Sequence, residues 1–238
     1  MRIAVISDIH ANCLALEAVL EDIKAQGADV TLNLGDLVSG PLEPARTADL
    51  LLEADFPTIA GNHERDLIAN VALEPVDRFA RSRLSERHLD WFAELPATLA
   101  VNGEVFMCHG TPRSDSTPWL DAWFKERTAT LPSEAEVTAQ AEGIAYPVIL
   151  CGHTHLARTV RLRDGRLVVN PGSVGLQMVH GSPDARYAII ERRGAAWTVG
   201  LRAVPYDHEA AARQAVSHGF ASWTEALTTG WAGPEGLF

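Results

Sequence analysis

Residues of the types that bind metal ions follow five short apolar runs of the sequence. The polar stretches are "SDIH" at 7–10, "GD" at 35–36, "GNHE" at 61–64, "CHG" at 108–110 and "GHTH" at 152–155. The apolar runs are typical of buried strands, and the carboxyl ends of strands line the ligand crevice of an open α/β sheet. Each stretch alone has an ordinary explanation, since Asp8 and Asp36 could cap helices and His109 could be a core histidine. Five together favour a shared site.

The residue types in these stretches indicate metal-ion chemistry. The candidate ligands are Asp8, His10, Asp36, Asn62, His109, His153 and His155. Such a mixed set of nitrogen and oxygen ligands suits Mn, Fe, Zn or Ni rather than a thiolate site. The set is too large for one tetrahedral ion and fits two divalent ions about 3.5–4 Å apart, with Asp36 as the shared carboxylate. Two such ions carry more charge than the carboxylates cancel, so they would bind an anionic phosphoryl group and activate a shared water.

Charge and hydropathy argue against several kinds of partner. The chain has 238 residues and a formal net charge of −11, and its arginines are scattered, so neither a partner of long nucleic acid nor a nuclease is predicted. No apolar run approaches the roughly 18 residues of a membrane span. The N-terminal stretch becomes polar too early for a signal peptide, so we expect a cytoplasmic protein with no membrane partner. The three cysteines lack CxxC spacing and are expected to be reduced core thiols.

The order of the predicted elements indicates an α/β fold. Strands are predicted at 2–7, 29–36 and 56–63, and helices at 12–26 and 41–54. This alternation is typical of a largely parallel sheet. Later residues predict further helices over much of 64–94, short helices from 207, and β-hairpins that turn at 102–103, 164–165 and near 194. We expect one domain over residues 1–238 with two sheets.

Residues 114–145 interrupt this pattern with a segment rich in Trp, Ala and Glu. We expect a helical insertion that could form a lid over the site. Trp119 and Trp123 are four residues apart, so a helix would place them on one face. That face would either cover the site or pack against the core.

The ordered stretches resemble the motifs of the calcineurin-like metallophosphoesterase superfamily, which are D-x-H, G-D, G-N-H-[DE], a lone His and G-H-x-H. This sequence has "DIH", "GD", "GNHE", "CHG" and "GHTH" in that order over residues 8–155. The resemblance implies an α/β fold built as a four-layer α-β-β-α sandwich of two packed mixed sheets. It also implies a dinuclear-metal-dependent phosphoesterase that acts by attack of a hydroxide bound to the metals.

The resemblance assigns a role to each residue. One divalent ion would be held by Asp8, His10, Asp36 and His155, and the other by Asp36, Asn62, His109 and His153. His63 matches a position that is not a ligand but faces the substrate, where it would assist the leaving group or steady the phosphoryl charge. Mn²⁺ is the first choice of metal, with Fe, Zn or Ni as alternatives.

One stretch distinguishes branches of the superfamily. Where the phosphoprotein phosphatase branch has GDxVDRG, this chain reads "GDLVSG". Ser39 and Gly40 thus replace the Asp that orients the catalytic His and the Arg that grips phosphate. The following "GP", with "NPGSVG" at 170–175, is more similar to the small bacterial and archaeal phosphodiesterase branch. Arg65 and Arg113 are candidate substitutes for the missing Arg, or ordinary surface or ion-pair residues.

We therefore expect hydrolysis of small phosphodiester or nucleotide-like substrates. Without the Arg, a dianionic monoester loses a bidentate clamp, whereas a diester carries one charge fewer and depends less on it. A phosphoprotein or phosphomonoester phosphatase is the first alternative. The second is a catalytically silent metal-binding scaffold, which the intact ligand set and His63 disfavour.

Overall fold

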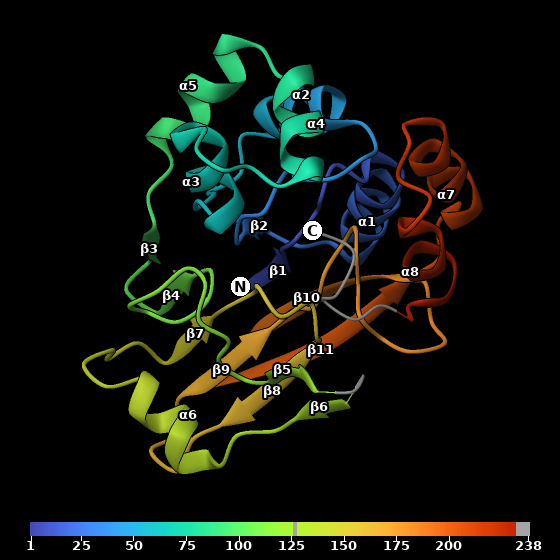
Figure 1. Ribbon diagram of the computed structural model, residues 1–238. Coiled ribbons are helices and arrows are strands. Elements are labelled where there is room, and N and C mark those ends of the chain that lie inside the picture. The colour runs from blue at the N-terminus through green and yellow to red at the C-terminus, as the bar shows by residue number, and fades with distance from the viewer. Residues whose placement is uncertain (126–127, 232–238) are drawn as a thin grey trace.

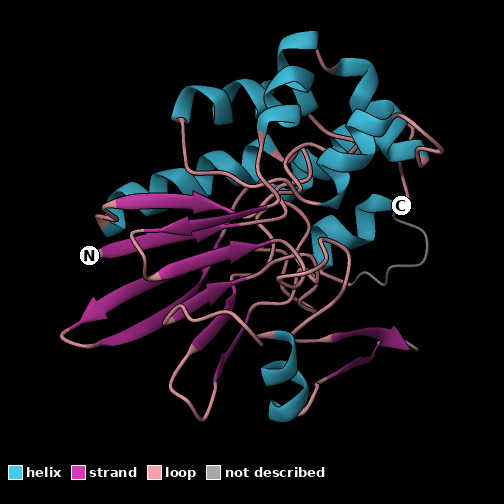
Figure 2. Ribbon diagram, turned by 90° about the vertical axis from the view of Figure 1, so that its left-hand side faces the viewer, coloured by secondary structure: helices cyan, strands magenta, loops and turns pink. Residues whose placement is uncertain are grey.

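The computed structural model describes residues 1–125 and 128–231 of the chain. Two mixed β-sheets pack face to face and helices cover their outer sides, so the layers run α-β-β-α as the sequence predicts (Figure 1). In Figure 2 most helices lie on one side of the strands, and the short helix α6, Glu134–Gln140, lies on the other side.

The first sheet has the strand order β11-β10-β1-β2. Its strands are β1 Arg2–Ile6, β2 Val30–Asn33, β10 Ala185–Arg193 and β11 Ala196–Val204. β1 runs parallel to β2 and antiparallel to β10, and β10 and β11 form a hairpin. The N-terminal strand therefore lies inside its sheet, which explains why Ile3 to Ile6 form an unbroken buried apolar run.

The second sheet has the strand order β3-β4-β7-β9-β8. Its strands are β3 Thr98–Val101, β4 Val105–Cys108, β7 Val148–Leu150, β8 Arg158–Arg161 and β9 Leu167–Asn170. The central strands β4, β7 and β9 are parallel, and the edge strands β3 and β8 are antiparallel to their neighbours. The loops that follow β4 and β7 therefore leave the sheet at the same end.

Alternate residues of the central strands supply two cores. Between the sheets, Ile3 and Val5 of β1 belong to one cluster with Met107, Leu150 and Val169 of the second sheet. The intervening residues of β1 face the helices instead. Full burial of each such aliphatic side chain stabilises the fold by roughly 1.5–3 kcal/mol.

The helices that pack against the first sheet come mainly from the N-terminal half. They are α1 Cys13–Gln26, α2 Pro44–Ala54, α3 Asn62–Ala69, α4 Pro75–Arg83 and α5 Glu86–Glu94. The C-terminal helices α7 His208–Ser217 and α8 Trp223–Thr229 pack on each other, and α7 contacts α1. Local signals set the ends of α1, because the Asn12 side chain accepts the Ala15 N–H and Gly27 closes the helix at φ 65°.

The strand predicted at 56–63 is largely wrong. An isolated bridge between Asn33 and Thr58 pairs this segment with β2. Pro57 accepts the Asn33 N–H with its carbonyl but has no N–H of its own, so a regular ladder cannot continue. The chain then begins α3 at Asn62, so "GNHE" lies at a helix start rather than at a strand end.

The helical insertion predicted at 114–145 is also wrong over most of its length. The segment contains strands β5 Ala122–Lys125 and β6 Thr128–Thr130, and its helix is the short α6. Prolines at 118 and 132 interrupt any long helix. Trp119 is buried against the second sheet and donates its indole N–H to the Val137 carbonyl at 3.1 Å, so it packs in a core. The Trp123 side chain lies outside the described residues.

The cysteines are buried free thiols, as predicted: Cys13, Cys108 and Cys151. Within residues 1–125 and 128–231, no helix has the length and apolar character that crossing a bilayer requires.

Candidate metal centre

The candidate ligands lie in loops that meet where the two sheets end. Asp8 follows β1, Asp36 follows β2, His109 follows β4 and His153 follows β7. Backbone pairing continues past the strands, since the His10 N–H donates to the Asp36 carbonyl at 3.1 Å. The His153 N–H donates to Asp8 Oδ2 at 3.2 Å, which joins the loops of the first and second sheets.

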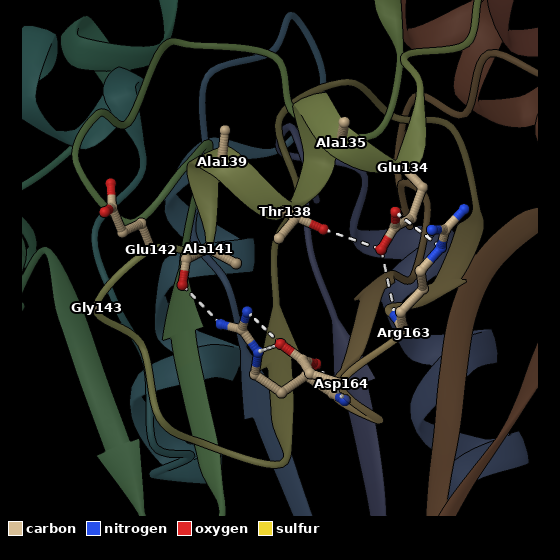
Figure 3. A pocket seen from close by; sticks show the side chains of 10 residues that line it. Glu134, Ala135, Thr138, Ala139, Ala141, Glu142, Gly143, Arg163 and Asp164 are labelled. Carbon is tan, nitrogen blue, oxygen red and sulfur yellow. Dashed lines mark hydrogen bonds and ion pairs between the residues drawn. The ribbon is translucent and has the colours of Figure 1, made fainter.

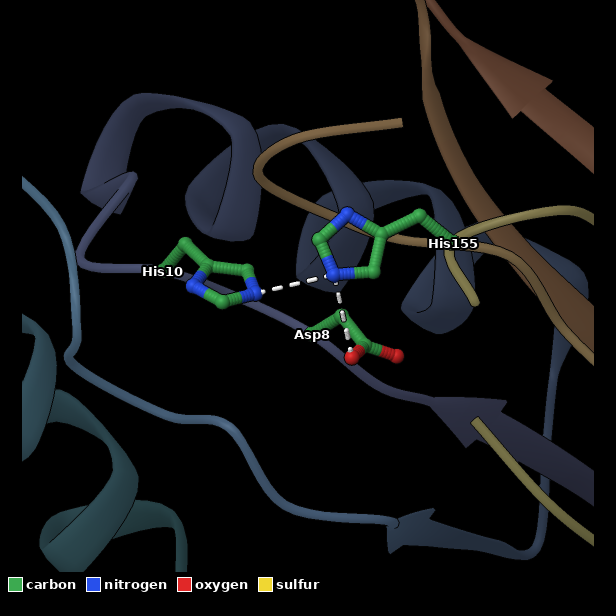
Figure 4. A group of neighbouring side chains, drawn as sticks. All are labelled: Asp8, His10 and His155. Atoms are coloured by element: carbon green, nitrogen blue, oxygen red, sulfur yellow. Dashed lines mark hydrogen bonds and ion pairs between the residues drawn. The ribbon is translucent and has the colours of Figure 1, made fainter. Parts of the chain in front are cut away.

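Two groups of three buried side chains form in these loops. They are Asp8, His10 and His155, shown in Figure 4, and Asp36, His109 and His153. Within each group the potential ligand atoms all lie within 4.8 Å of one another. The fold therefore brings together every histidine and carboxylate that the sequence marks as a ligand.

In the first group the two imidazole rings present Nε2 atoms to each other. His10 Nε2 lies 3.0 Å from His155 Nε2, which lies 3.3 Å from Asp8 Oδ1. Each ring donates its Nδ1–H to a backbone carbonyl at 2.6 Å, that of Ser39 for His10 and that of Leu176 for His155. Because a carbonyl can only accept, the Nε2 atoms of neutral rings carry lone pairs, which repel unless a proton or a cation lies between them.

The second group is built in the same way. His109 donates its Nδ1–H to the Leu34 carbonyl at 2.7 Å, and its Nε2 lies 3.0 Å from Asp36 Oδ2. The His153 ring lies 5.4 Å from the His109 ring, measured between centroids. His109 Nε2 also lies 3.9 Å from Asp8 Oδ1, so the two groups adjoin.

One atom of the predicted ligand set, Asn62 Oδ1, is buried with no hydrogen bond among the described residues, and the buried Asp8 Oδ1 and His109 Nε2 face other candidate ligands. Leaving a buried polar atom without a partner costs roughly 1–3 kcal/mol. Asn62 begins α3, and the N–H of the next residue, His63, donates to Asp36 Oδ1 at 3.1 Å. Asp8 Oδ1, Asn62 Oδ1 and His109 Nε2 are the atoms through which these side chains coordinate ions, so the residues fit divalent cations.

The backbone of the candidate ligands is strained. The angle φ is 54° at Asp8, 48° at His10, 55° at Asp36, 67° at His153 and 60° at His155. In this left-handed region the Cβ of an L-residue crowds the backbone, at a cost of roughly 1–2 kcal/mol for each residue. Such strain persists where surrounding contacts enforce it, and it is concentrated at functional sites.

Glu64 holds the loop that carries Asp36, a role that the sequence analysis missed. Its fully buried carboxylate accepts the backbone N–H groups of Asp36, Leu37 and Gly61, each at 2.8 Å. Burial, together with the charge of Asp36, raises the pKa of Glu64 to about 6. Its place in the first turn of α3, where a carboxylate can reach back to the N-cap N–H, is the signal that could have revealed it.

Burial keeps two of the rings neutral. It lowers the pKa of His10 to about 3 and that of His153 to about 4, so both present lone pairs at neutral pH. Burial also acts to lower the pKa of His109, but the charges of Asp36 and Asp8 raise it to about 10. Without a cation, a proton on His109 balances the two carboxylates.

His63 lies beside the two groups rather than within them. Its ring lies 5.4 Å from that of His10, centroid to centroid, and its Nδ1 lies 3.1 Å from Asp77 Oδ1. Burial acts to lower the pKa of His63, but the charge of Asp36 and the hydrogen bond with Asp77 raise it to about 9. In the metal-free chain the ring therefore carries a proton at neutral pH.

Asp77 supplies the carboxylate that the phosphoprotein phosphatase branch has at the position of Ser39. Asp77 lies in the first turn of α4, and the Ser39 hydroxyl donates to the same oxygen that contacts His63. The inference that this functional group is absent is therefore wrong, because the carboxylate comes from another element. No local motif marks Asp77, since an acidic residue in the first turn of a helix is common.

The two candidate phosphate-binding arginines are engaged elsewhere. Arg65 donates from Nε to Asp115 Oδ2 at 2.7 Å and from Nη1 to Asp66 Oδ1 at 2.5 Å. Arg113 donates to the backbone carbonyls of Gln140 and Glu142 at the end of α6. Arg65 lies two residues from His63, whereas Arg113 points toward α6.

A cavity of about 800 Å³ between α6 and the β8–β9 turn is separate from the metal centre (Figure 3). Most of its charged groups pair with one another, because Arg163 pairs with Glu134 and Arg166 pairs with Asp164. Arg166 also donates to the Ala141 carbonyl at 2.6 Å. These contacts fasten α6 to the second sheet and give the cavity no chemistry of its own.

Two packed mixed sheets bring clustered histidines and carboxylates together where their loops meet, as a metal-binding site requires. The chain belongs to the calcineurin-like phosphoesterase superfamily, because the model of that superfamily's domain matches residues 1–194. The chain is thus a phosphoesterase, as the resemblance implied, and its His/Asp groups indicate divalent metal binding.

Known relatives span nearly the whole chain. A metallophosphoesterase from Sphaerobacter thermophilus is 28% identical, with a TM-score of 0.78 over 97% of this chain and 99% of its own. A hypothetical protein from Pyrococcus horikoshii has the same fold, with 17% identity and a TM-score of 0.79 over 97% of this chain and 98% of its own. An uncharacterized protein from Methanocaldococcus jannaschii is 24% identical over 245 residues, covering 93% of this chain and 94% of the relative.

Proposed function

We propose that the chain is a phosphodiesterase that uses two divalent cations to hydrolyse small phosphodiester or nucleotide-like substrates. The observation that carries this proposal is the pair of adjoining His/Asp groups, joined by the 3.9 Å approach of His109 Nε2 to Asp8 Oδ1. The buried Asn62 Oδ1, which has no hydrogen bond among the described residues, and the strained loops support it independently.

Each group would hold one cation, and Asp36 would be shared. Asp8, His10 and His155 would complete the first set, and Asn62, His109 and His153 the second. The charge of Asp36 supports a shared role because it acts on a ring of each group: it opposes the fall in the pKa of His10 and contributes to the rise in the pKa of His109. When bound, the cations would attract the phosphoryl group and activate water as the nucleophile, with Mn²⁺ the first metal to test.

His63 is the residue that would transfer a proton. Asp77 fixes the ring through Nδ1, so Nε2 is the nitrogen that would serve the leaving oxygen. As the bond from phosphorus to that oxygen breaks, the Nε2 proton would pass to the oxygen and an alcohol would depart. A histidine whose Nδ1 is hydrogen-bonded to a buried carboxylate suits this general-acid role.

The surroundings of the site favour a diester over a monoester. Gly40 stands where a phosphate-gripping Arg would be, and Arg65 and Arg113 already have partners. A dianionic monoester would therefore find no ready bidentate clamp. The net charge of −11 would repel long polyanions, which leaves small substrates.

A phosphomonoesterase is the second candidate, and the Asp77–His63 contact favours it. The phosphoprotein phosphatase branch combines an Asp that orients the catalytic His with an Arg that grips phosphate. In this chain Asp77 supplies the first of these two groups. The missing Arg is then the remaining distinction between the two candidates.

A matched pair of aryl substrates tests the proposal. The Mn²⁺-loaded chain would be assayed with an aryl phosphodiester and the corresponding aryl monoester, and we expect the higher kcat/KM for the diester. Dephosphorylation of the monoester or of phosphoserine peptides without diesterase activity would overturn the proposed preference. Tight metal binding with no turnover of any ester would favour the silent scaffold.

A further inference from the structure

A cavity of about 410 Å³, here called the side pocket, adjoins the candidate metal centre. His109 of the second group lines it, and so does Arg65, two residues along α3 from His63. Its volume falls within the roughly 300–1,000 Å³ of small-molecule sites. A phosphoryl group at the metal centre would therefore have space beside it for the organic group that it carries.

Three of the nine residues that line the side pocket bear a hydroxyl group, and those of Thr111 and Ser114 also accept hydrogen bonds within the loop. Thr98, Thr111 and Ser114 each contribute a hydroxyl-bearing side chain, and Asp115 and Arg65 add a carboxylate and a guanidinium. The described residues that line it include no Phe, Tyr or Trp. Such a lining can exchange hydrogen bonds with the alcohols of a sugar, whereas an aryl group would find no aromatic ring to stack on.

The loop that bears these groups is held in place by its own contacts. The Thr111 N–H donates to the Ser114 carbonyl at 2.7 Å, and the Ser114 N–H returns a bond to the Thr111 carbonyl at 3.2 Å. Arg113 ties the loop to the end of α6. A preorganised loop loses little conformational entropy when a ligand binds.

Asp115 is the charged acceptor of the side pocket. Its two oxygens lie 2.7 Å from Arg65 Nε and 3.3 Å from Arg65 Nη2. Burial acts to raise the pKa of Asp115, but this guanidinium holds it below its usual value. An ionised carboxylate accepts a hydrogen bond from an alcohol about twice as strongly as a neutral acceptor does.

We propose that the side pocket binds the organic group of the phosphodiester and selects a hydroxylated, sugar-like group, with Asp115 and Thr98 accepting or donating hydrogen bonds to its alcohols. The inference rests on the proposed diesterase function. It specifies which class of organic group the substrate carries and which residues select that group.

Three diesters that share one leaving group test the selectivity of the side pocket separately from the diesterase activity. These are the p-nitrophenyl phosphodiesters of uridine at its 5′ oxygen, of 2′,3′-dideoxyuridine at the same oxygen, and of methanol. With Mn²⁺ present, we expect kcat/KM for the uridine ester to exceed that for the dideoxy ester about tenfold, because one or two hydrogen bonds to the sugar are lost. The difference should lie mainly in KM.

Matched variants locate the selectivity. Asp115→Ala should reduce the uridine-to-dideoxyuridine ratio from about ten to about three, and Thr98→Val, which keeps the side-chain shape, should also lower it about threefold. Asp66→Ala is the control, since Asp66 also pairs with Arg65 but does not line the pocket. The ratio in this control should equal that of the unmodified chain.

The outcomes separate clearly. A ratio near one in the unmodified chain, with the methyl ester hydrolysed, would overturn the inference and leave the diesterase proposal standing. If Asp66→Ala also lost the selectivity, the effect would come from the ion pairs of Arg65. The inference would then be overturned as well. Failure to hydrolyse any of the three esters would overturn the diesterase proposal itself.

Discussion

The loops of the metal centre and the turns of the β-hairpins both use the left-handed backbone, but they sustain it differently. In the β3–β4 turn the residues are Asn102 and Gly103, at φ 52° and 67°, and these types adopt the conformation at little cost. In the metal centre the residues include His10, His153 and His155, whose larger side chains make this conformation costlier. The hairpin turn is therefore stable through its own sequence, whereas the site loops depend on contacts from elsewhere.

Those supporting contacts are specific and buried. Glu64 accepts three backbone N–H groups around the Asp36 loop, and backbone carbonyls fix the Nδ1 atoms of His10, His109 and His155. Around Gly103, by contrast, a Cβ would meet no atom within 4 Å. Backbone strain is therefore concentrated where the ligand atoms must converge, and contacts from the surrounding structure support it.

The largest expected effect is the loss of the shared carboxylate. Asp36→Ala should abolish metal-dependent turnover, because both cations would lose a ligand, while the fold survives as judged by circular dichroism. Asp22→Asn is a suitable control, since Asp22 pairs with Arg202 outside both groups. Residual turnover of more than a few per cent in Asp36→Ala would contradict the shared role.

Replacing Asn62 and replacing His63, the neighbours in "GNHE", should have different effects on metal binding and turnover. His63→Ala should lower kcat by about 10²–10⁴ with both metal ions still bound, the usual scale for lost general acid–base assistance. Asn62→Ala should instead weaken binding of one cation, measured by titration with Mn²⁺. Equal metal loss in both variants would show that the two roles are wrongly divided.

Removing a support of the site loops should lower the stability of the chain more than changing a hairpin turn does. Glu64→Ala leaves three buried N–H donors without an acceptor, so the free energy of unfolding of the metal-free chain should fall by about 3 kcal/mol. Asn102→Gly should change it by only a few tenths, since Gly adopts the same backbone conformation. Urea denaturation measures both, and similar values for the two variants would remove the contrast between site loops and hairpin turns.

The Asp77–His63 contact should give a smaller effect on catalysis. Asp77→Asn should lower kcat by about 10–100-fold with metal content unchanged, the usual scale for a group that orients a catalytic residue. Moving the carboxylate, by combining Asp77→Ser with Ser39→Asp, should recover part of the loss because Ser39 contacts Asp77. An unchanged kcat in Asp77→Asn would remove Asp77 from the mechanism.

Much of this molecule follows from its sequence, because many of its determinants are local. The apolar runs predict β1 and β2, and Asn102-Gly103 predicts the β3–β4 turn where the structure has it. The polar stretches also predict which histidines and carboxylates meet, because strand ends line a shared crevice, although here the strands belong to two sheets.

The failures have long-range causes. Asp77 contacts Ser39 across 38 residues, a pairing that only the packing of α4 creates. The 114–145 segment has the composition of a helix, but its prolines and the burial of Trp119 favour a hairpin with one short helix. Whether that segment acts as a lid stays a prediction.

The central claim is that two cations bind side by side and share Asp36. The direct test is to load the metal-free chain with Mn²⁺, measure the metal content, and record the electron paramagnetic resonance spectrum. The account predicts two Mn²⁺ ions per chain with a spin-coupled spectrum, and loss of that coupling in Asp36→Ala. One ion per chain with full activity, or two ions without coupling, would contradict it.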